Sequence, residues 1–234
     1  MNEVTLDLVI LSAIGDTYTM RIFQISGKGR VGKTTVAQEI QKKAFESGYI
    51  PVILPFADSL KKAAAELGYS KESNPDEYRK FCQELGAGKR KEDPNYWINK
   101  TFESIQEYML KEVDNQLEEK EYWEYVLIQD DVRYMNELAL GRELAAIQIF
   151  VDSGGRELPE HNATWRTHES EELANKAEDS FGKPNSDYED LFDIILFNGS
   201  TVAHLKEDIN SDFDAWIELG KLEIEEMDWT EEDD

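Results

Sequence analysis

The stretch 25-ISGKGRVGKTTVA-37 follows directly on the short apolar run 21-RIFQI-25. Within it, residues 27–34 (GKGRVGKT) fit the pattern G-x-x-x-x-G-K-[ST] without a mismatch. Glycines adopt backbone conformations that other residues avoid, so consecutive N–H groups can point at phosphate oxygens. The apolar run before the loop and the helical pattern after it supply the strand and helix that this loop requires. The stretch therefore predicts a nucleoside triphosphate site at a strand-to-helix turn.

Each residue type in this loop has a chemical task. Gly27, Gly29 and Gly32 free the backbone to wrap around phosphate groups. Lys33 brings a cation to the β- and γ-phosphates, and the Thr34 hydroxyl is a ligand for Mg²⁺. The N-terminus of the following helix adds its positive dipole. The predicted ATP-binding residues of the loop are Gly27, Lys28, Gly29, Arg30, Val31, Gly32, Lys33, Thr34 and Thr35.

Short runs rich in Ile, Val, Leu and Phe recur between longer polar segments with helical spacing. They are 21-RIFQIS-26, 51-PVILPF-56, 125-YVLIQD-130, 146-AIQIFV-151 and 192-FDIILF-197. Nearly continuous apolarity suits strands that are covered on both faces, as parallel sheets require. Alternation of strand and helix predicts a doubly wound α/β fold with right-handed crossovers. We therefore expect three layers, with a five-stranded, mainly parallel sheet between helices on both faces.

The 234 residues, 40% of them hydrophobic, are enough for one sizeable core. Two connections are too long for simple crossovers. The first is mostly helical in pattern (58–69, 76–86 and 94–119), and the second, 152–191, is polar with Gly and Pro near both ends. Insertions at the carboxyl edge of such a sheet grip substrates and form lids. We expect one domain over 1–234, with an N-terminal extension (1–20), a helical insertion (58–119), a lid-containing segment (152–191) and an acidic tail (218–234).

The charge balance is strongly acidic, with 50 Asp and Glu against 25 Lys and Arg and a formal net charge of −25. Such a field repels nucleic-acid backbones and anionic membranes, so neither is an expected partner. No apolar run approaches the ~20 residues of a membrane helix, and the N-terminus lacks the basic start and cleavage site of a secretion signal. The single Cys82, interpreted as a small apolar residue on a helix, fits a reducing cytoplasm. We expect a cytoplasmic location.

The third apolar run ends in 126-VLIQDDVRYMNE-137. An acidic residue at the carboxyl end of a buried strand is the usual partner of a phosphate loop and holds Mg²⁺ through water. Asp130 and Asp131 point to opposite faces if both are extended, so one of them is expected to reach the metal. We pair Asp130 with Thr34 at the metal and count Asp131 as catalytic, although the pattern leaves their order open and a helix N-cap would satisfy either. Arg133 follows, where a guanidinium can clamp a phosphate.

The segment 130-DDVRYMNE-137 resembles the DDVRFxNE element of the deoxynucleoside monophosphate kinases of tailed phages. Segment 56-FADSLKKAAAELG-68 is similar to the FAxPLK stretch of that family, with Ser59 in place of the usual Pro. Next, 79-RKFCQELGAGKRKEDPNYWINK-100 resembles its R-x-x-x-Q-x-LG…R…W helix pair, and 166-RTHESE-171 its H-x-SE lid segment. Finally, 193-DIILFNGSTVAHL-205 looks like its last strand, N-x-G turn and helix. The resemblance covers residues 21–210 in order.

The resemblance implies a P-loop kinase fold with a helical acceptor-binding insertion and a lid. The implied reaction transfers the γ-phosphoryl group of ATP, with Mg²⁺, to the 5′-phosphate of a deoxynucleoside monophosphate. Catalysis is then mainly alignment and charge neutralisation by cations around the transferring group. The expected catalytic residues are Lys33, Asp131, Arg133 and Arg166, and Arg156 is expected at the ATP. The implied acceptor-site residues are Asp58, Lys61, Arg79, Arg90, Trp97, Arg133 and His168.

Other interpretations stay open at this point. Asp58 could cap a helix, Lys61 could be solvated, Trp97 could be a core aromatic and His168 a surface residue. The chain could also be another small-molecule P-loop kinase, acting on dephospho-coenzyme A, adenylate or a nucleoside. Outside the enzymes, it could be a nucleotide-binding regulatory module or an acidic mimic of DNA. If a phage encodes the chain, the expected compartment is the host cytoplasm, and a homodimer through the N-terminal segment is a possible assembly.

Overall fold

The computed structural model describes residues 18–116, 123–155, 168–180 and 189–226. The chain divides into two compact units, each described by itself. The sheet unit comprises Thr19–Ile53 and Trp123–Asp234. The helical unit comprises Met1–Tyr18 and Leu54–Tyr122.

Within the described part of the sheet unit, five strands form one parallel sheet in the order β2-β3-β1-β4-β5. The strands are β1 (Tyr18–Ser26), β2 (Ile50–Ile53), β3 (Trp123–Val132), β4 (Ile147–Asp152) and β5 (Ile194–Phe197). The helices are α2 (Lys33–Glu46), α6 (Met135–Glu143), α7 (Glu172–Ser180) and α8 (Val202–Glu226), with short 3-10 turns η3 (Glu169–Glu171) and η4 (Glu189–Leu191). The predicted α/β class and the five strand positions are confirmed.

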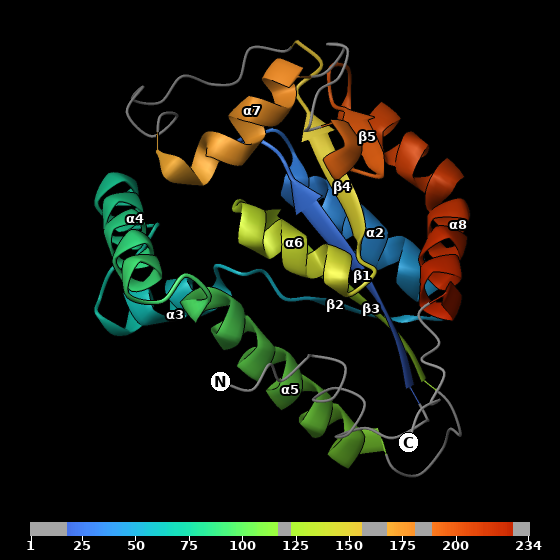
Figure 1. Cartoon of the computed structure of the whole chain (residues 1–234), viewed down its shortest axis with the longest axis horizontal. Coiled ribbons are helices and arrows are strands. Elements are labelled where there is room, and N and C mark those ends of the chain that lie inside the picture. The colour runs from blue at the N-terminus through green and yellow to red at the C-terminus, as the bar shows by residue number, and fades with distance from the viewer. Residues whose placement is uncertain (1–17, 117–122, 156–167, 181–188, 227–234) are drawn as a thin grey trace, which may run out of the picture. The chain divides into compact units, whose positions relative to one another are not determined.

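Helices flank both faces of this sheet (Figure 1). Phe23 and Ile25 of β1 pack into the main hydrophobic core with α2 and α8. Gln24, between them, points to the other face, where its Nε2 donates to Gln129 Oε1 at 2.8 Å and to the Glu137 carbonyl of α6 at 3.2 Å. Successive residues of a strand face opposite sides, so α6 lies across the sheet from α2 and α8. The three expected layers are present in the sheet unit.

The strand order creates a switch point at β1. The chain leaves β1 for β2 at one edge, returns in β3, and then continues to β4 on the other side of β1. In open α/β sheets, ligands bind outside the carboxyl ends of the strands at such a point. The turn from β1 into α2 begins there, directly after Ser26. At its far end α2 stops at Glu46, and Gly48 follows with φ +90°. A glycine in this conformation directly after a helix is a common stop signal.

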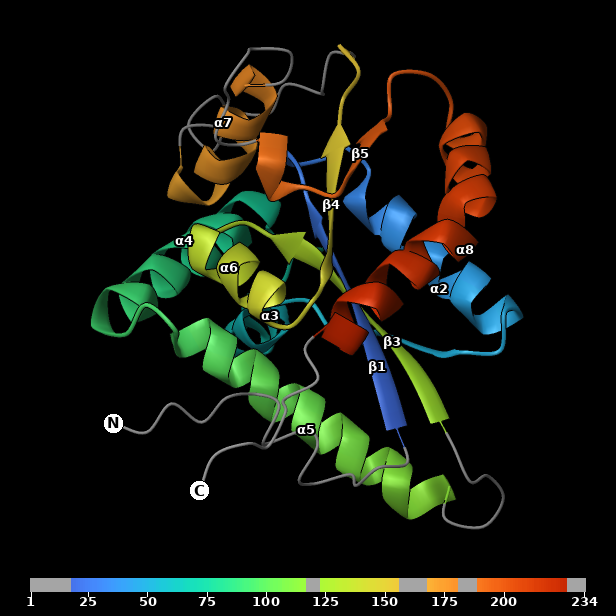
Figure 2. The ribbon, with the colours of Figure 1, turned by 45° about the vertical axis from the view of Figure 1, so that its right-hand side comes forward.

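In the described part of the helical unit, α3 (Asp58–Glu66), α4 (Pro75–Glu92) and α5 (Tyr96–Gln116) contact one another (Figure 2). Helix α4 begins after Asn74, whose side chain accepts from Glu77 N, and it has Pro75 at its first position. The sequence predicts an end for this helix at 86, but the helix continues to Glu92. Gly86 does not adopt the positive φ of a helix-ending glycine, and its carbonyl accepts from Trp97 Nε1 at 3.1 Å.

Among the residues that the structure describes, no helix is both long enough and apolar enough to cross a bilayer.

Candidate functional site

The turn 27-GKGRVGKT-34 forms a loop, called the cradle below, that packs against the ends of β4 and β5. Gly27 and Gly32 have φ of +137° and +114°, a region that favours glycine. A Cβ on Gly27 would lie 2.5 Å from the carbonyl oxygen of Val151, and one on Gly32 would lie 2.6 Å from Asn198 Nδ2. Asn198, which follows β5, donates Nδ2 to Val31 O at 2.7 Å. Gly27 and Gly32 are therefore required both by backbone conformation and by close packing.

Lys33 is the first residue of α2 and lies inside the cradle, with its side chain buried. Its Nζ donates to the carbonyls of Gly27 at 2.6 Å and Lys28 at 2.8 Å. Burial, and secondly the charge of Arg133, lower the pKa of Lys33 to about 7. Nearby carboxylates act in the opposite direction but do not cancel the burial. An anion that entered the cradle would restore the charge of this amine.

A hydroxyl and a carboxylate meet beside the cradle. Thr34 Oγ1 donates to Asp130 Oδ2 at 2.9 Å, which joins the start of α2 to the end of β3. Two adjacent protein oxygens of this kind suit Mg²⁺, which completes its shell with phosphate oxygens and water. Among the described residues, no group of three or more His, Cys, Asp or Glu side chains is arranged to hold a metal ion. Asp131, the next residue in the chain, is buried. Its charge acts to raise the pKa values of Lys33 and Arg133.

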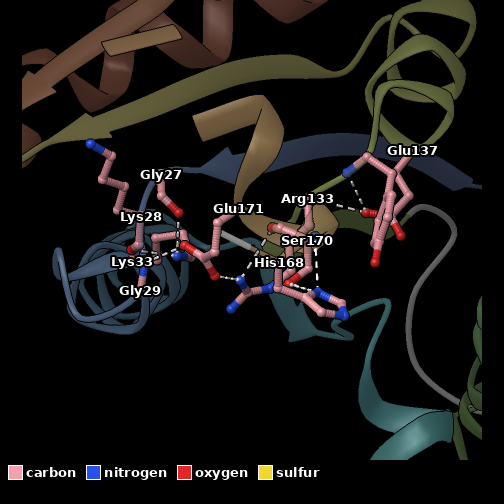
Figure 3. Close-up of polar contacts among 10 residues, drawn as sticks. Gly27, Lys28, Gly29, Lys33, Arg133, Glu137, His168, Ser170 and Glu171 are labelled. Atoms are coloured by element: carbon pink, nitrogen blue, oxygen red, sulfur yellow. Dashed lines mark hydrogen bonds and ion pairs between the residues drawn. The ribbon is translucent and has the colours of Figure 1, made fainter. Parts of the chain in front are cut away.

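Arg133 follows β3 and reaches toward the cradle (Figure 3). Its Nη1 forms an ion pair with Glu171 Oε1, and the other oxygen of Glu171 accepts from Gly29 N at 3.0 Å. The backbone N–H of Arg133 donates to Glu137 Oε2 at 2.9 Å, which fixes the position of the Arg133 backbone. Burial disfavours the charged guanidinium, but Glu171 and Asp131 outweigh it and raise the pKa of Arg133. The cradle and the arginine thus share one buried carboxylate.

Residues 168–180, which form η3 and α7, lie against the cradle through two carboxylates. Glu171 accepts the backbone N–H of Gly29. Glu178 contacts the loop through an ion pair between its Oε2 and Lys28 Nζ. Burial raises the pKa of Glu178, and the ammonium of Lys28 opposes that shift. His168 caps η3, since its Nδ1 accepts from Ser170 N at 3.2 Å. These contacts place two acidic side chains, Glu171 and Glu178, against the loop that the sequence predicts to bind phosphate.

The predicted site residues of the sheet unit come together, and those of the helical unit are described separately. Lys33 and Thr34 belong to the cradle, and Asp130 and Arg133 lie beside it as expected. The charge of Asp131 acts on Lys33 and Arg133. His168 lies in the segment that contacts the cradle, and its imidazole serves as a cap. The predicted cations Arg156 and Arg166 lie outside the described residues.

In the helical unit, Asp58 is the first residue of α3 and pairs with Lys62 at 2.9 Å. Trp97 is buried, and its indole N–H bonds α5 to α4. The nearest heavy atom to a Cβ placed on Gly86 would be Arg90 Nη1, at 3.2 Å. Lys61 lies on α3, and Arg79 lies on α4. The acceptor-site roles of these side chains stay predictions.

Sequence reasoning missed three residues that shape the site: Glu171, Glu178 and Asn198. Glu171 ends the segment 166-RTHESE-171 and Asn198 lies in 193-DIILFNGSTVAHL-205, so both positions were marked but their roles were not. Its partner Gly29 is 142 residues away, and Asn198 and Val31 are 167 apart. No local pattern reports a contact over such a separation.

No protein-family model matches the chain, and a search of curated proteins finds no match. The functional assignment therefore rests on the residues and the geometry.

Proposed function

We propose that this chain is a P-loop kinase that transfers the γ-phosphoryl group of ATP to the 5′-phosphate of a deoxynucleoside monophosphate. The observation that carries the proposal is the convergence at the end of β1. A glycine loop holds the buried Lys33 at a helix N-terminus, with the Thr34–Asp130 pair on one side and Arg133 near the loop. A glycine turn with a structural role alone would not need a buried amine, an oxygen pair and a guanidinium around it.

The proposed chemistry follows from charge. The backbone N–H groups of the cradle and the N-terminus of α2 would bind the phosphate chain, and Lys33 would contact its β- and γ-phosphates. Thr34 and Asp130 would hold Mg²⁺, which neutralises charge on the phosphate oxygens when it is bound. Arg133 would compensate the charge of the transferring group and the acceptor phosphate. The acceptor phosphate is itself the nucleophile, so alignment of two polyanions is the main task of the protein.

The acceptor class rests on the sequence resemblance. The segment 130-DDVRYMNE-137 and the four similar segments favour a deoxynucleoside monophosphate over other acceptors. The proposed acceptor-site residues remain Asp58, Lys61, Arg79, Arg90, Trp97, Arg133 and His168, and the proposed lid cations remain Arg156 and Arg166. Another small-molecule P-loop kinase would share the cradle but would turn over a different acceptor.

The test is a panel of acceptors. The protein is incubated with ATP, Mg²⁺ and each deoxy- and ribonucleoside monophosphate, and ADP formation is followed. At least one deoxynucleotide should stimulate ADP formation, and Lys33→Ala should abolish this activity. Lys42→Ala is the matched control because Lys42 is on the same helix with a mostly exposed side chain, and it should behave as wild type. ADP formation that ignores every monophosphate would refute the kinase proposal and favour a simple ATPase or a regulatory module.

A further inference from the structure

One carboxylate sits where the proposed function needs a phosphate. Glu171 is 5% exposed, and both of its oxygens have partners (Figure 3). One accepts the N–H of Gly29 in the cradle, and the other pairs with the guanidinium of Arg133. The charge of Glu171 also acts on the buried amine of Lys33 and raises its pKa. A backbone N–H and a guanidinium therefore hold a single side-chain anion, and its charge reaches the buried amine of Lys33.

These partners are the ones that bind phosphate oxygens. Carboxylate and phosphate oxygens both accept from the planar fork of Arg and from backbone N–H groups that point into a concavity. The carboxylate of Glu171 thus occupies donors of the kind that would bind phosphate, namely the N–H of Gly29 and the guanidinium of Arg133. The ion pair between Lys28 and Glu178 repeats this arrangement at a second cation of the loop.

A bound phosphate chain and the Glu171 carboxylate would compete for the same place. The N–H of Gly29 points at the carboxylate from 3.0 Å, so a phosphate oxygen can accept it only after the carboxylate leaves. A carboxylate that remained beside a polyanion would also repel it strongly, because the interior screens charge poorly. Arg133 is the exception, since a guanidinium has five N–H donors and can turn from one anion to another.

We propose that Glu171 is an internal ligand of the cradle, and that the phosphate chain of the nucleotide displaces its carboxylate and takes over Arg133. The proposal rests on the proposed function in one respect, namely that the cradle binds a phosphate chain. A different role for Glu171 would be to stay in place and orient Arg133 toward the substrate. The two roles predict opposite changes of anion affinity when the charge of Glu171 is removed.

The probe is inorganic tripolyphosphate without metal, titrated into the full chain by isothermal calorimetry. Glu171→Gln keeps the shape of the side chain but removes its charge. If the Glu171 carboxylate occupies the cradle in about nine of ten free molecules, the native protein binds the probe about tenfold more weakly than a protein without this competitor. Glu171→Gln should therefore bind tripolyphosphate about tenfold more tightly. Glu172→Gln is the matched control, because Glu172 is the next residue, is exposed and pairs with Lys176; its affinity should equal that of the wild type.

An affinity of Glu171→Gln that is equal to or weaker than that of the wild type would overturn the proposal and favour the orienting role. Failure of both proteins to bind the probe would overturn the proposed function together with it, so the two failures are distinguishable. If the variant does not fold, the native chain still gives an answer through the side-chain carboxyl carbon of Glu171, followed by ¹³C NMR. Saturating tripolyphosphate should shift this resonance toward that of a solvated carboxylate, and an unchanged resonance would refute displacement.

Discussion

The low pKa of Lys33 predicts that phosphate binding takes up a proton at alkaline pH. With a pKa of about 7, roughly 90% of the Lys33 side chains are neutral at pH 8 in the free protein. A phosphate in contact with the amine favours its charged form and returns the pKa toward the ordinary value of 10.5. Binding of ATP should therefore take up about 0.9 proton at pH 8 and about 0.1 proton at pH 6.

The sign and size of the affinity change follow from the same numbers. The pKa of Lys33 is higher in the complex than in the free protein, so its contribution is complete below pH 7 and is lost as the pH rises toward the pKa of the complex. Well above pH 7, each unit of pH weakens binding about tenfold, or about 1.4 kcal/mol. Between pH 7 and pH 9 the free fraction with a charged amine falls from about one half to about one hundredth. ATP affinity should therefore fall on the order of 50-fold, which is about 2 kcal/mol.

The assay is calorimetric titration of ATP in EDTA at pH 8, in two buffers with different enthalpies of ionisation. Proton uptake makes the apparent binding enthalpies differ by about 0.9 times the difference between the buffer enthalpies. Lys33→Arg is the control, because a guanidinium stays charged at every pH used and should show no uptake. Equal apparent enthalpies for the native protein in the two buffers would refute the argument, since they would mean that Lys33 is already charged in the empty cradle.

Three further outcomes are expected. Arg133→Ala should lower phosphoryl transfer on the order of 10³-fold and weaken ATP binding much less, measured by ADP release and calorimetry; an unchanged dependence on the acceptor would contradict the role of Arg133. Gly32→Ala should lower the free energy of unfolding in urea by about 2–3 kcal/mol, because positive φ is strained and the new Cβ meets Asn198. Gly48→Ala is its control, with φ +90° but open space, and should lose about 1 kcal/mol. Glu39→Gln should lose about 2 kcal/mol at pH 7, because the bond from Lys206 at 2.8 Å lowers the pKa of Glu39. That contribution is present above pH 4.5, the unfolded value, and is lost as the pH falls through the folded value, so the two proteins should converge in acid.

The sheet was predictable because its strands are encoded locally. Each apolar run of about six residues became a parallel strand, and Gly48 marked the end of α2. The apolar pattern does not mark where each strand ends. Strand β2 stops at Ile53, although the apolar pattern continues through 51-PVILPF-56. Pro55 has no N–H for a ladder, and Phe56 is buried in the helical unit. The strand order β2-β3-β1-β4-β5 had no local signal, because pairing depends on contacts between distant residues.

The site residues also fall into two groups, those that local sequence indicates and those that depend on contacts between distant residues. Lys33 and Thr34 belong to a motif of adjacent residues, and Asp130 was found because it ends an apolar run. In each case the backbone of one turn or one strand end fixes the side chain. Glu171 could not be found in this way, because a glutamate among other acidic residues in 166-RTHESE-171 resembles a solvated turn. Its significance comes from Gly29 and Arg133, which only the fold brings to it.

The acidic excess of the chain has a direct consequence at the cradle. Lys28, Lys33 and Arg133 place three cationic groups around one loop, and Arg133 is one reason why the pKa of Lys33 is low. Without counter-charges this cluster would oppose folding of the empty protein through mutual repulsion. Glu171 and Glu178 supply two negative charges at the loop, whereas ATP supplies about four at pH 8. Exchange of carboxylates for phosphates therefore increases the negative charge around the same cations, which is why binding should draw a proton onto Lys33 rather than release one. Removal of the Glu171 charge should then lower the pKa of Lys33 further in the free protein, and Glu171→Gln should take up a proton on binding ATP even at pH 7, where the native chain takes up about half of one.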